Sequence, residues 1–389
     1  MKLADTARQV LAPTYRQPDP ILTRGEGCWV WDEDDNAYLD MTTGIAVTSL
    51  GHGAPVVREA LIEAANGLTH TSNLYFTRPA IELATALVEH SFADRVFFCN
   101  SGTESVEGAI KFARLAAGDR RDIVYFDGAF HGRTFGALAA TDREASRRPF
   151  EPLPGGFRRA PFDDDIALTM IDESVAAVMV EPLQGEGGVR VPRPEWLRAL
   201  RTRCDEVGAL LIADEIQCGL SRTGRLWAHE HADIQPDIMT LAKPLAGGLP
   251  MGAILLGPRV VDAISPGVHG STFGGGPLVA KVALAVFHAL RDPELLAGVQ
   301  PRADLLRKAL LEALGNDLIE VRGVGLLMGV ALRLDHPGRA MARAAFEEGL
   351  LLAAASGNVL RILPPLNAPE ADLLEAVDRL ARTVRRLKG

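Results

Sequence analysis

In 95-RVFFCNSGTESVEGAIKFARLAAGDRRDIVYFD-127, two short apolar runs enclose a segment with helical spacing. The runs 95–100 and 123–127 do not alternate between polar and apolar residues, which predicts strands that are buried on both faces. The apolar residues of 103–118 fall broadly on one side of a helix, and Gly118 can end it. A strand, a helix and a second strand in succession favour an α/β fold with a mostly parallel sheet.

The same alternation continues along the chain. A helix with proline at its start is predicted at 194–208, and buried strands are predicted at 176–182, 209–215, 237–243 and 252–257. These segments extend the predicted sheet into a large central layer.

Both ends of the chain have a different pattern. We expect an N-terminal arm at 1–55, with a hairpin at 26–41 that turns at 33–36, and we assign this arm to the small domain. A large domain follows at 56–295. The small α+β domain continues at 296–389, with helices at about 300–314 and 370–387 and strands within 318–332 and 358–366.

Composition excludes several classes of protein. The 389 residues are 47% hydrophobic and 23% charged, as in ordinary globular proteins, and the net charge of −9 disfavours nucleic-acid binding. The basic segment 143-REASRRPF-150 is too short for a binding patch and is interpreted as a solvated loop. No apolar run approaches the ~20 residues that span a bilayer. The four cysteines lack disulfide-like or zinc-like spacing, so we expect a cytoplasmic protein without a membrane partner.

Polar residues follow four of the predicted strands at the point where each strand ends. They are Asn100 and Ser101, Glu181, Asp214 and Glu215, and Lys243. Ligands of open parallel sheets bind outside the carboxyl ends of the strands, so we expect these side chains to share one crevice.

Each of these positions has a functional and an ordinary structural interpretation. The helix that begins at Gly102-Thr103 can bind a phosphate through its N-terminal amides, or Ser101 or Thr103 can simply cap it. Asp214 at the edge of a buried strand needs a cationic partner, which a protonated ring nitrogen or a structural arginine would supply. Desolvation makes Lys243 a nucleophile toward aldehydes, unless its side chain reaches the surface.

Together, these three features indicate pyridoxal 5'-phosphate. That cofactor requires an anion site for its phosphate, a carboxylate at its pyridinium nitrogen and a lysine for its aldehyde. No histidine cluster accompanies the carboxylates, so a metal site is a weaker alternative.

Motifs in the same order throughout the chain resemble the class III (ω-amino-acid) aminotransferases of fold type I, and among these the acetylornithine aminotransferases. The motifs are 24-RGEGCWVWDEDDNAYLDMTTGIAVTSLGH-52, 71-TSNLYFT-77, 100-NSGTESVEGAIKFAR-114, 130-FHGRTFGAL-138, 181-EPLQGEGGV-189, 214-DEIQCGLSRTG-224, 240-TLAKPLAGGLPMGA-253 and 270-GSTFGGGPL-278.

The resemblance implies a role for each cofactor-binding residue. Lys243 binds the cofactor aldehyde covalently and later moves a proton, and Asp214 pairs with the pyridinium nitrogen. Ser101, Gly102 and Thr103 hold the phosphate, Gln217 bonds the ring hydroxyl, and Phe130 and Ile216 cover the two faces of the ring. Thr272 reaches the phosphate of a partner subunit, so the resemblance implies a homodimer.

The resemblance also implies how substrates are held. Arg133 grips a substrate carboxylate, because its planar fork bonds both oxygens. Arg361 is a second carboxylate-binding arginine, and Glu186 is placed to pair with it. In this hypothesis Glu186 neutralises Arg361 while an ω-amino donor is bound and moves away when glutamate binds.

The residue at position 45 bears on the choice of donor. Ornithine aminotransferases are expected to have tyrosine there, so Ile45 suits an acylated α-amino group. The implied reaction transfers the terminal amine of N-acetylornithine to 2-oxoglutarate, a step of arginine biosynthesis. Acetyllysine, carrier-linked lysine, succinylornithine and 4-aminobutyrate remain alternative donors. Gly276 stands where many relatives have asparagine, and Pro244 where glycine is frequent.

Two functions of other classes remain open at this stage. An aminomutase or racemase would use the same cofactor without 2-oxoglutarate. A cofactor-binding protein without catalysis is disfavoured, because Lys243, Asp214 and Arg133 are all present.

Overall fold

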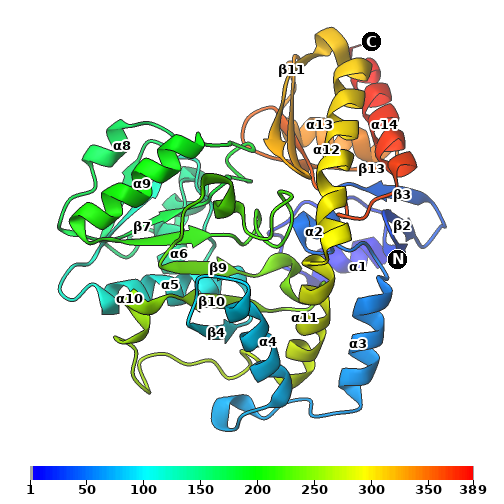
Figure 1. The fold of residues 1–389 in the computed structure, drawn as a ribbon. Helices are drawn as coiled ribbons and strands as arrows, with labels where there is room; N and C mark the ends of the chain where they lie inside the picture. Colours follow the sequence, from blue (N-terminus) through cyan, green and yellow to red (C-terminus); the bar gives the residue numbers. More distant parts are fainter. Residues whose placement is uncertain (1–2, 389) are drawn as a thin grey trace.

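The computed structural model describes residues 3–388, and its centre is a mostly parallel sheet. Within those residues the sheet has seven strands in the order β4-β10-β9-β8-β7-β5-β6 (Figure 1). In chain order they are β4 (Arg95–Cys99), β5 (Asp122–Phe126), β6 (Phe157–Ala160), β7 (Val175–Val180), β8 (Leu210–Asp214), β9 (Ile238–Leu241) and β10 (Gly252–Leu256). The predicted α/β fold class is confirmed, and six of these strands lie at predicted positions.

The direction of the strands decides which ends meet. β6, β5, β7, β8 and β9 pair in parallel, whereas β10 is antiparallel to both β9 and β4. Two reversals make β4 point the same way as the parallel strands. The carboxyl ends of β4, β7, β8 and β9 therefore share one edge of the sheet.

Helices cover the sheet on both faces, as continuous apolar strands require. Every residue of β7, β8 and β10 is buried. Alternate residues of β8 face opposite ways, so Ile212 packs in the cluster that contains α5 (Gly102–Ala116), and Leu211 in the cluster that contains α9 (Pro194–Val207). Gly208, with a φ of 71°, ends α9 in the left-handed conformation that favours glycine.

The strand β6 (Phe157–Ala160) was not predicted. Its sequence is FRRA, and the two arginines interrupt the apolar run that marks the other strands. β6 lies at the edge of the sheet beside β5, where polar side chains are tolerated.

Two smaller sheets lie outside the central one. The first has the order β1-β2-β3-β13, with β1 (Leu22–Glu26), β2 (Trp29–Asp32), β3 (Ala37–Asp40) and β13 (Leu350–Leu351). Leu350 of β13 pairs in parallel with Leu39, so the N-terminal hairpin is joined to the C-terminal part of the chain. The second has the order β11-β12-β15-β14, with β11 (Leu318–Val324), β12 (Leu327–Leu332), β14 (Ala353–Ala354) and β15 (Val359–Ile362).

The predicted domain limits stay a proposal, and their outermost residues Met1, Lys2 and Gly389 lie outside the described part of the chain. The remaining α-helices are α1 (Leu3–Val10), α2 (Thr43–Ala46), α3 (Pro55–Ala65), α4 (Arg78–Glu89), α6 (Phe135–Ala139), α7 (Glu144–Arg147), α8 (Ile166–Thr169), α10 (Pro258–Val261), α11 (Pro277–Leu290), α12 (Pro293–Leu314), α13 (Gly338–Glu347) and α14 (Glu370–Lys388). Short 3-10 helices are η1 (Ser72–Leu74), η2 (Arg148–Phe150), η3 (Ala228–Ala232), η4 (Lys243–Ala246) and η5 (Gly315–Asp317).

Helix α12 begins earlier than predicted. The expected start at about residue 300 is wrong, because the helix starts at Pro293 and continues through Pro301. Asp292 caps it, and its Oδ1 accepts hydrogen bonds from the backbone amides of Glu294 and Leu295 at 2.9 and 3.1 Å.

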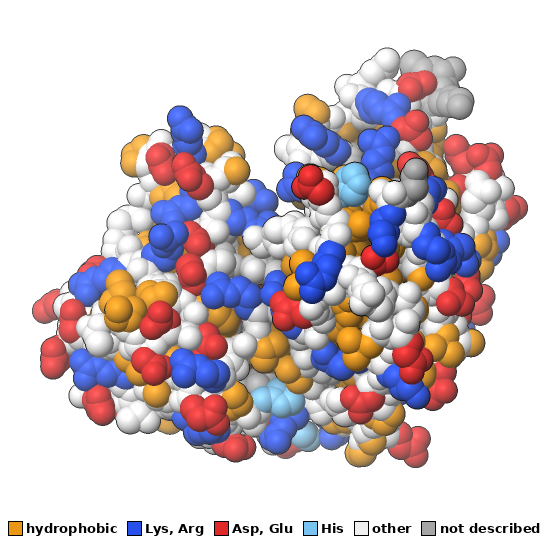
Figure 2. Space-filling view, turned by 90° about the horizontal axis from the view of Figure 1, so that it is seen from above, with side chains coloured by type: hydrophobic (Ala, Val, Ile, Leu, Met, Phe, Trp, Pro, Cys, Tyr) orange, Lys and Arg blue, Asp and Glu red, His pale blue; other side chains and the backbone are white. Residues whose placement is uncertain are grey.

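The surface carries both signs of charge. The view from above shows acidic and basic side chains interspersed on that face, with a hollow between two projecting parts (Figure 2). Within residues 3–388, no helix is long and apolar enough to cross a membrane.

Candidate active site

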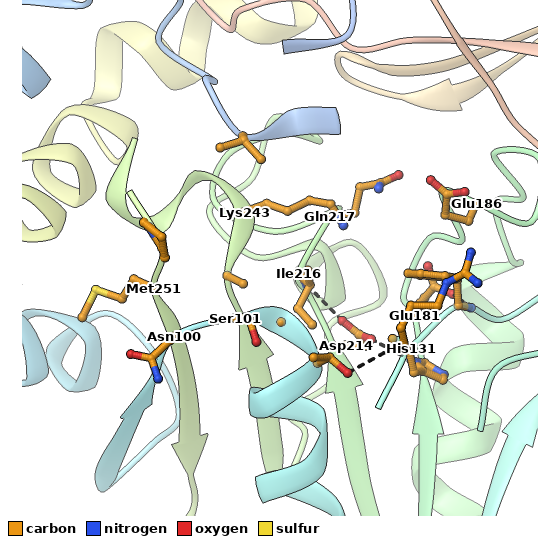
Figure 3. Close-up of a pocket in the computed structure, with 18 of the residues that line it drawn as sticks. Asn100, Ser101, His131, Glu181, Glu186, Asp214, Ile216, Gln217, Lys243 and Met251 are labelled. Carbon is orange, nitrogen blue, oxygen red and sulfur yellow. Dashed lines mark hydrogen bonds and ion pairs between the residues drawn. The ribbon is translucent and has the colours of Figure 1, made fainter. Parts of the chain in front are cut away.

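A pocket of ≈ 450 Å³ lies at the shared carboxyl edge of the central sheet. Residues predicted to converge there from four strand ends line it: Asn100 and Ser101 after β4, Glu181 after β7, Asp214 at the end of β8 and Lys243 after β9. The prediction is wrong for Glu215, which is not a lining residue because its carboxylate accepts hydrogen bonds from the backbone amides of Ala228 and His229 at 2.6 and 2.8 Å. Figure 3 shows these side chains around one space, with Lys243 extended toward Gln217. The topology of the sheet thus brings together residues that are far apart in the chain.

Lys243 begins a short turn that a glycine ends. It is the first residue of η4, and Pro244 follows it at a helical start, where proline is favoured. Gly247 ends the turn with a φ of 60°, and a Cβ there would lie 2.6 Å from Val57 Cγ2. Burial lowers the pKa of Lys243, and although Asp214 opposes this shift, the charge of Arg361 adds to it. The amine therefore loses its proton more easily than an exposed lysine does.

Asp214 is paired with a histidine that the sequence did not single out. Its Oδ2 lies 2.6 Å from Nδ1 of His131, and its Oδ1 accepts a hydrogen bond from the amide of Ile216 at 3.1 Å. Burial alone lowers the pKa of His131, but the hydrogen bond and charge of Asp214 outweigh it and raise that pKa. Within the described residues, Nε2 of His131 is buried without a hydrogen-bond partner.

Glu181 is a second buried carboxyl group beside this pair. Burial raises its pKa to about 7, and although His131 opposes this shift, the charge of Asp214 adds to it. Its two oxygens accept hydrogen bonds from the amides of Phe130 at 3.0 Å and Gly185 at 3.3 Å. Glu181 thereby fixes the loop that carries Phe130 and His131.

The N-terminus of α5 forms another part of the pocket wall. Ser101 caps the helix by accepting a hydrogen bond from the amide of Glu104 at 3.3 Å, so its ordinary structural interpretation also holds. A Cβ on Gly102 would lie 3.0 Å from Ile216 Cδ1, which shows how closely the backbone approaches this side chain. The Oγ1 of Thr103 accepts from the amide of Thr134 at 3.2 Å.

At the other side of the pocket, Glu186 contacts Arg361. Its Oε1 lies 2.5 Å from Nη2 of Arg361, which is buried on β15. The Nη1 of Arg361 donates to Oε1 of Gln217 at 2.8 Å, so the amide nitrogen of Gln217 is the atom left to face a ligand. Burial opposes ionisation of Glu186, but the charges of Arg361 and Arg143 lower its pKa and keep it anionic.

The pocket is lined by ten of the predicted site residues: Ser101, Gly102, Thr103, Phe130, Arg133, Glu186, Asp214, Ile216, Gln217 and Lys243. Arg361 lies behind them through its contacts with Glu186 and Gln217. Ile45 and Thr272 are exposed and are not among the lining residues.

Ile45 belongs to an unusual turn. Thr43, Gly44, Ile45 and Ala46 all have φ between 48° and 66°, so α2 is a left-handed turn rather than an ordinary helix. Such a conformation is strained for a β-branched residue, and backbone strain concentrates at functional sites. Val47, directly after the turn, lines the pocket.

These residues fit pyridoxal phosphate. The pocket offers an amine with a lowered pKa, a buried carboxylate locked by His131, and the N-terminus of a 15-residue helix, which suits a phosphate. Phe130 and Ile216 supply apolar surface for a ring. Within residues 3–388, no group of three or more His, Cys, Asp or Glu side chains could hold a metal ion.

The comparisons with known proteins agree with this site. The family model described as "Aminotransferase class-III" matches residues 10–384. The chain is 47% identical to the mitochondrial acetylornithine aminotransferase of Alnus glutinosa, over 97% of this chain and 86% of that protein. It is also 47% identical to the acetylornithine aminotransferase of Xanthomonas axonopodis pv. citri, over 95% of this chain and 93% of that protein.

Solved structures show the same fold. The N-acetylornithine aminotransferase of Stenotrophomonas maltophilia K279a has a TM-score of 0.85 and 38% identity, covering 98% of both chains. The ornithine aminotransferase of Toxoplasma gondii ME49 has a TM-score of 0.94 and 33% identity, covering 99% of this chain and 95% of that one. The chain therefore belongs to the class III aminotransferases, which depend on pyridoxal phosphate.

Proposed function

We propose that this protein transfers the terminal amino group of N-acetylornithine to 2-oxoglutarate, giving N-acetylglutamate 5-semialdehyde and glutamate. The observation that carries the proposal is the ion pair between Glu186 and Arg361. The predicted carboxylate binder Arg133 lines the same pocket and has no ion-pair partner among residues 3–388. The donor has one carboxylate and the acceptor has two. If Arg361 is paired with Glu186 while the donor is bound and is free to bind the second carboxylate of the acceptor, one pocket can accept both substrates.

The chemistry is divided between the cofactor and the protein. Bound pyridoxal phosphate supplies an aldehyde that bonds to amines and a ring that withdraws electrons from the substrate carbon. Lys243 would hold that aldehyde and would take up and return the proton, which its lowered pKa permits. Asp214, fixed by His131, supplies a negative charge for the ring nitrogen.

The remaining residues bind and orient. The amides at Gly102 and Thr103 and the hydroxyl of Ser101 would hold the phosphate, and the Gln217 amide would bond the ring hydroxyl; all four residues line the pocket. Phe130 and Ile216, which also line the pocket, would enclose the ring and exclude water from it.

Donor choice rests on the names of the relatives and on position 45. Both curated relatives and one solved neighbour are described as acetylornithine aminotransferases. Ile45, two residues before the pocket-lining Val47, would give the donor's acylated α-amino group an apolar neighbour in place of a hydrogen-bonding side chain.

A panel of amino donors with 2-oxoglutarate tests this proposal. The panel comprises N-acetylornithine, ornithine, N-acetyllysine, N-succinylornithine and 4-aminobutyrate, and the formation of glutamate is measured. N-acetylornithine is expected to have the highest kcat/KM, by about tenfold or more, because single groups discriminate to that extent. A faster donor from the panel would replace N-acetylornithine, and turnover without 2-oxoglutarate would indicate an aminomutase.

The homodimer is part of the same proposal. Leu74, Tyr75, Phe76 and Phe273 are large exposed apolar side chains, and Phe76 is 96% exposed. Asn73 ties the two segments together by donating to the carbonyls of Ser271 and Gly274 at 2.7 and 3.1 Å. Apolar patches of this kind mark contact surfaces, and exposed Thr272 stands within this one. Light scattering tests the dimer, and cell fractionation tests the cytoplasmic location that we also propose.

A further inference from the structure

Glu186 has two arginine partners, one for each carboxylate oxygen. Its Oε1 lies 2.5 Å from Nη2 of Arg361, and its Oε2 lies 2.8 Å from Nη2 of Arg143. The same Nη2 of Arg143 donates to the backbone carbonyl of Glu186 at 2.9 Å. The sequence assigned Arg143 to a solvated loop, and that interpretation is wrong, because the side chain is held at the pocket.

The two arginines stand at different depths. The Arg361 side chain is 1% exposed, whereas that of Arg143 is 29% exposed. Arg143 directly precedes the short helix α7. Its Cζ lies 5.3 Å from the ring centroid of Phe130, and the Cζ of Arg133 lies 5.6 Å from the same centroid. Arg143 therefore lies nearer the surface, beside the lining residues Phe130 and Glu186, while Arg361 is buried behind the lining residues.

We propose that Arg143 retains Glu186 after Arg361 has released it, and thereby sets the affinity of the site for the second, dicarboxylate substrate. This inference rests on the proposed function, because only a two-carboxylate acceptor requires Arg361 to be free. When Arg361 binds a substrate carboxylate, Glu186 loses the partner at Oε1. Without Arg143 it would remain a largely buried anion with no cation, which is strongly unfavourable.

The balance of charge around Glu186 supports the same conclusion. Arg133, Arg143 and Arg361 carry three positive charges, and Glu186 carries one negative charge. The two remaining positive charges match the two negative charges of 2-oxoglutarate. Removing Arg143 would leave only one net positive charge, so the affinity for a dicarboxylate should fall more than the affinity for a monocarboxylate.

Binding of inert ligands to the holoenzyme tests the inference. Glutarate is the dicarboxylate probe, and N-acetylnorvaline is the monocarboxylate probe, because it keeps the acylated end of the donor but has no terminal amine. Dissociation constants are measured by titration calorimetry for the wild type, Arg143→Gln, Glu186→Gln and the double variant. Arg148→Gln is the matched control, since Arg148 is an exposed residue of the same segment.

Arg143→Gln is expected to weaken glutarate binding by about tenfold or more, and N-acetylnorvaline binding by less than about threefold. In the Glu186→Gln background the same change should alter glutarate binding by less than about threefold, because no anion is left to retain. Arg143→Lys keeps a positive charge that can reach Glu186 and should stay within about threefold of the wild type. Arg148→Gln should bind both probes as the wild type does.

Three results would overturn the inference. They are unchanged glutarate binding in Arg143→Gln, an equal loss in the Glu186→Gln background, and a loss in Arg143→Lys as large as in Arg143→Gln. The second would mean that Arg143 contacts the substrate carboxylate itself. These measurements need no amino donor, so a wild type that does not convert N-acetylornithine would refute the proposed function separately.

Discussion

Replacing Glu186 with glutamine changes the charge of one side chain and keeps its size, so it removes the ion pair with Arg361 together with the one with Arg143. The two groups are 2.5 Å apart between Oε1 and Nη2, and Arg361 is almost fully buried. Unit charges about 4 Å apart at an effective dielectric constant of about 20 interact by about 4 kcal/mol. The amide oxygen of glutamine still accepts a hydrogen bond of about 2 kcal/mol from a charged group, which leaves a net change of about 2 kcal/mol.

This net change acts in opposite directions on the two half-reactions. Arg361 becomes free for the second carboxylate of 2-oxoglutarate, so that half-reaction should be retained or gain. The amino donor arrives as an ammonium ion and now meets an uncompensated arginine, so its half-reaction should fall. A change of about 2 kcal/mol corresponds to about 30-fold in the ratio of the two rate constants.

Stopped-flow absorbance of the bound cofactor measures each half-reaction separately, with N-acetylornithine or with 2-oxoglutarate as the single substrate. Glu195→Gln on the exposed side of α9 is the matched control for the loss of a carboxylate. If Glu186→Gln slows both half-reactions by the same factor, Glu186 does not distinguish the two substrates. The ion pair between Glu186 and Arg361 would then not be the reason that one pocket accepts both substrates.

Three further predictions follow from the pocket. Because burial lowers the pKa of Lys243, its charged form destabilises the cofactor-free protein at neutral pH, and this penalty disappears as the pH rises from the lowered pKa toward the ordinary value of 10.5. Cofactor-free Lys243→Met should therefore have a higher melting temperature than the cofactor-free wild type at pH 7. An equal difference in melting temperature at pH 10 would contradict this. Gly102→Ala places a Cβ 3.0 Å from Ile216 and should weaken cofactor binding by about tenfold in a titration of cofactor-free protein, whereas Gly155→Ala has open space and should bind normally. His131→Leu leaves Asp214 without its buried partner and should lower the free energy of unfolding by about 3 kcal/mol in urea, and unchanged stability would refute the pair.

The sequence was sufficient to predict the sheet and one crevice, because both depend on local patterns. Apolar runs marked the buried strands, and the polar residue after each run marked its carboxyl end. Asn100, Asp214 and Lys243 could therefore be expected at one edge, and the pocket does contain them.

Contacts between distant loops could not be predicted in this way. His131 is 83 residues from Asp214 in the chain, and nothing in its neighbours shows which carboxylate it will meet. The motif 130-FHGRTFGAL-138 was the only signal for it. Arg143 is 43 residues from Glu186 and stands in a basic segment that resembles an ordinary surface loop. Its contact depends on where the segment between β5 and β6 brings it in the folded chain, beside the loop that follows β7.

The most direct test of the whole account is borohydride reduction of the holoenzyme followed by peptide mass analysis, with and without prior addition of N-acetylornithine. Without the donor, the cofactor should be fixed to the peptide that contains Lys243. With excess donor and no 2-oxoglutarate, this attachment should disappear, because the amino group has passed to the cofactor and Lys243 is free. A cofactor fixed at another residue, or an attachment at Lys243 that N-acetylornithine leaves unchanged, would contradict the account.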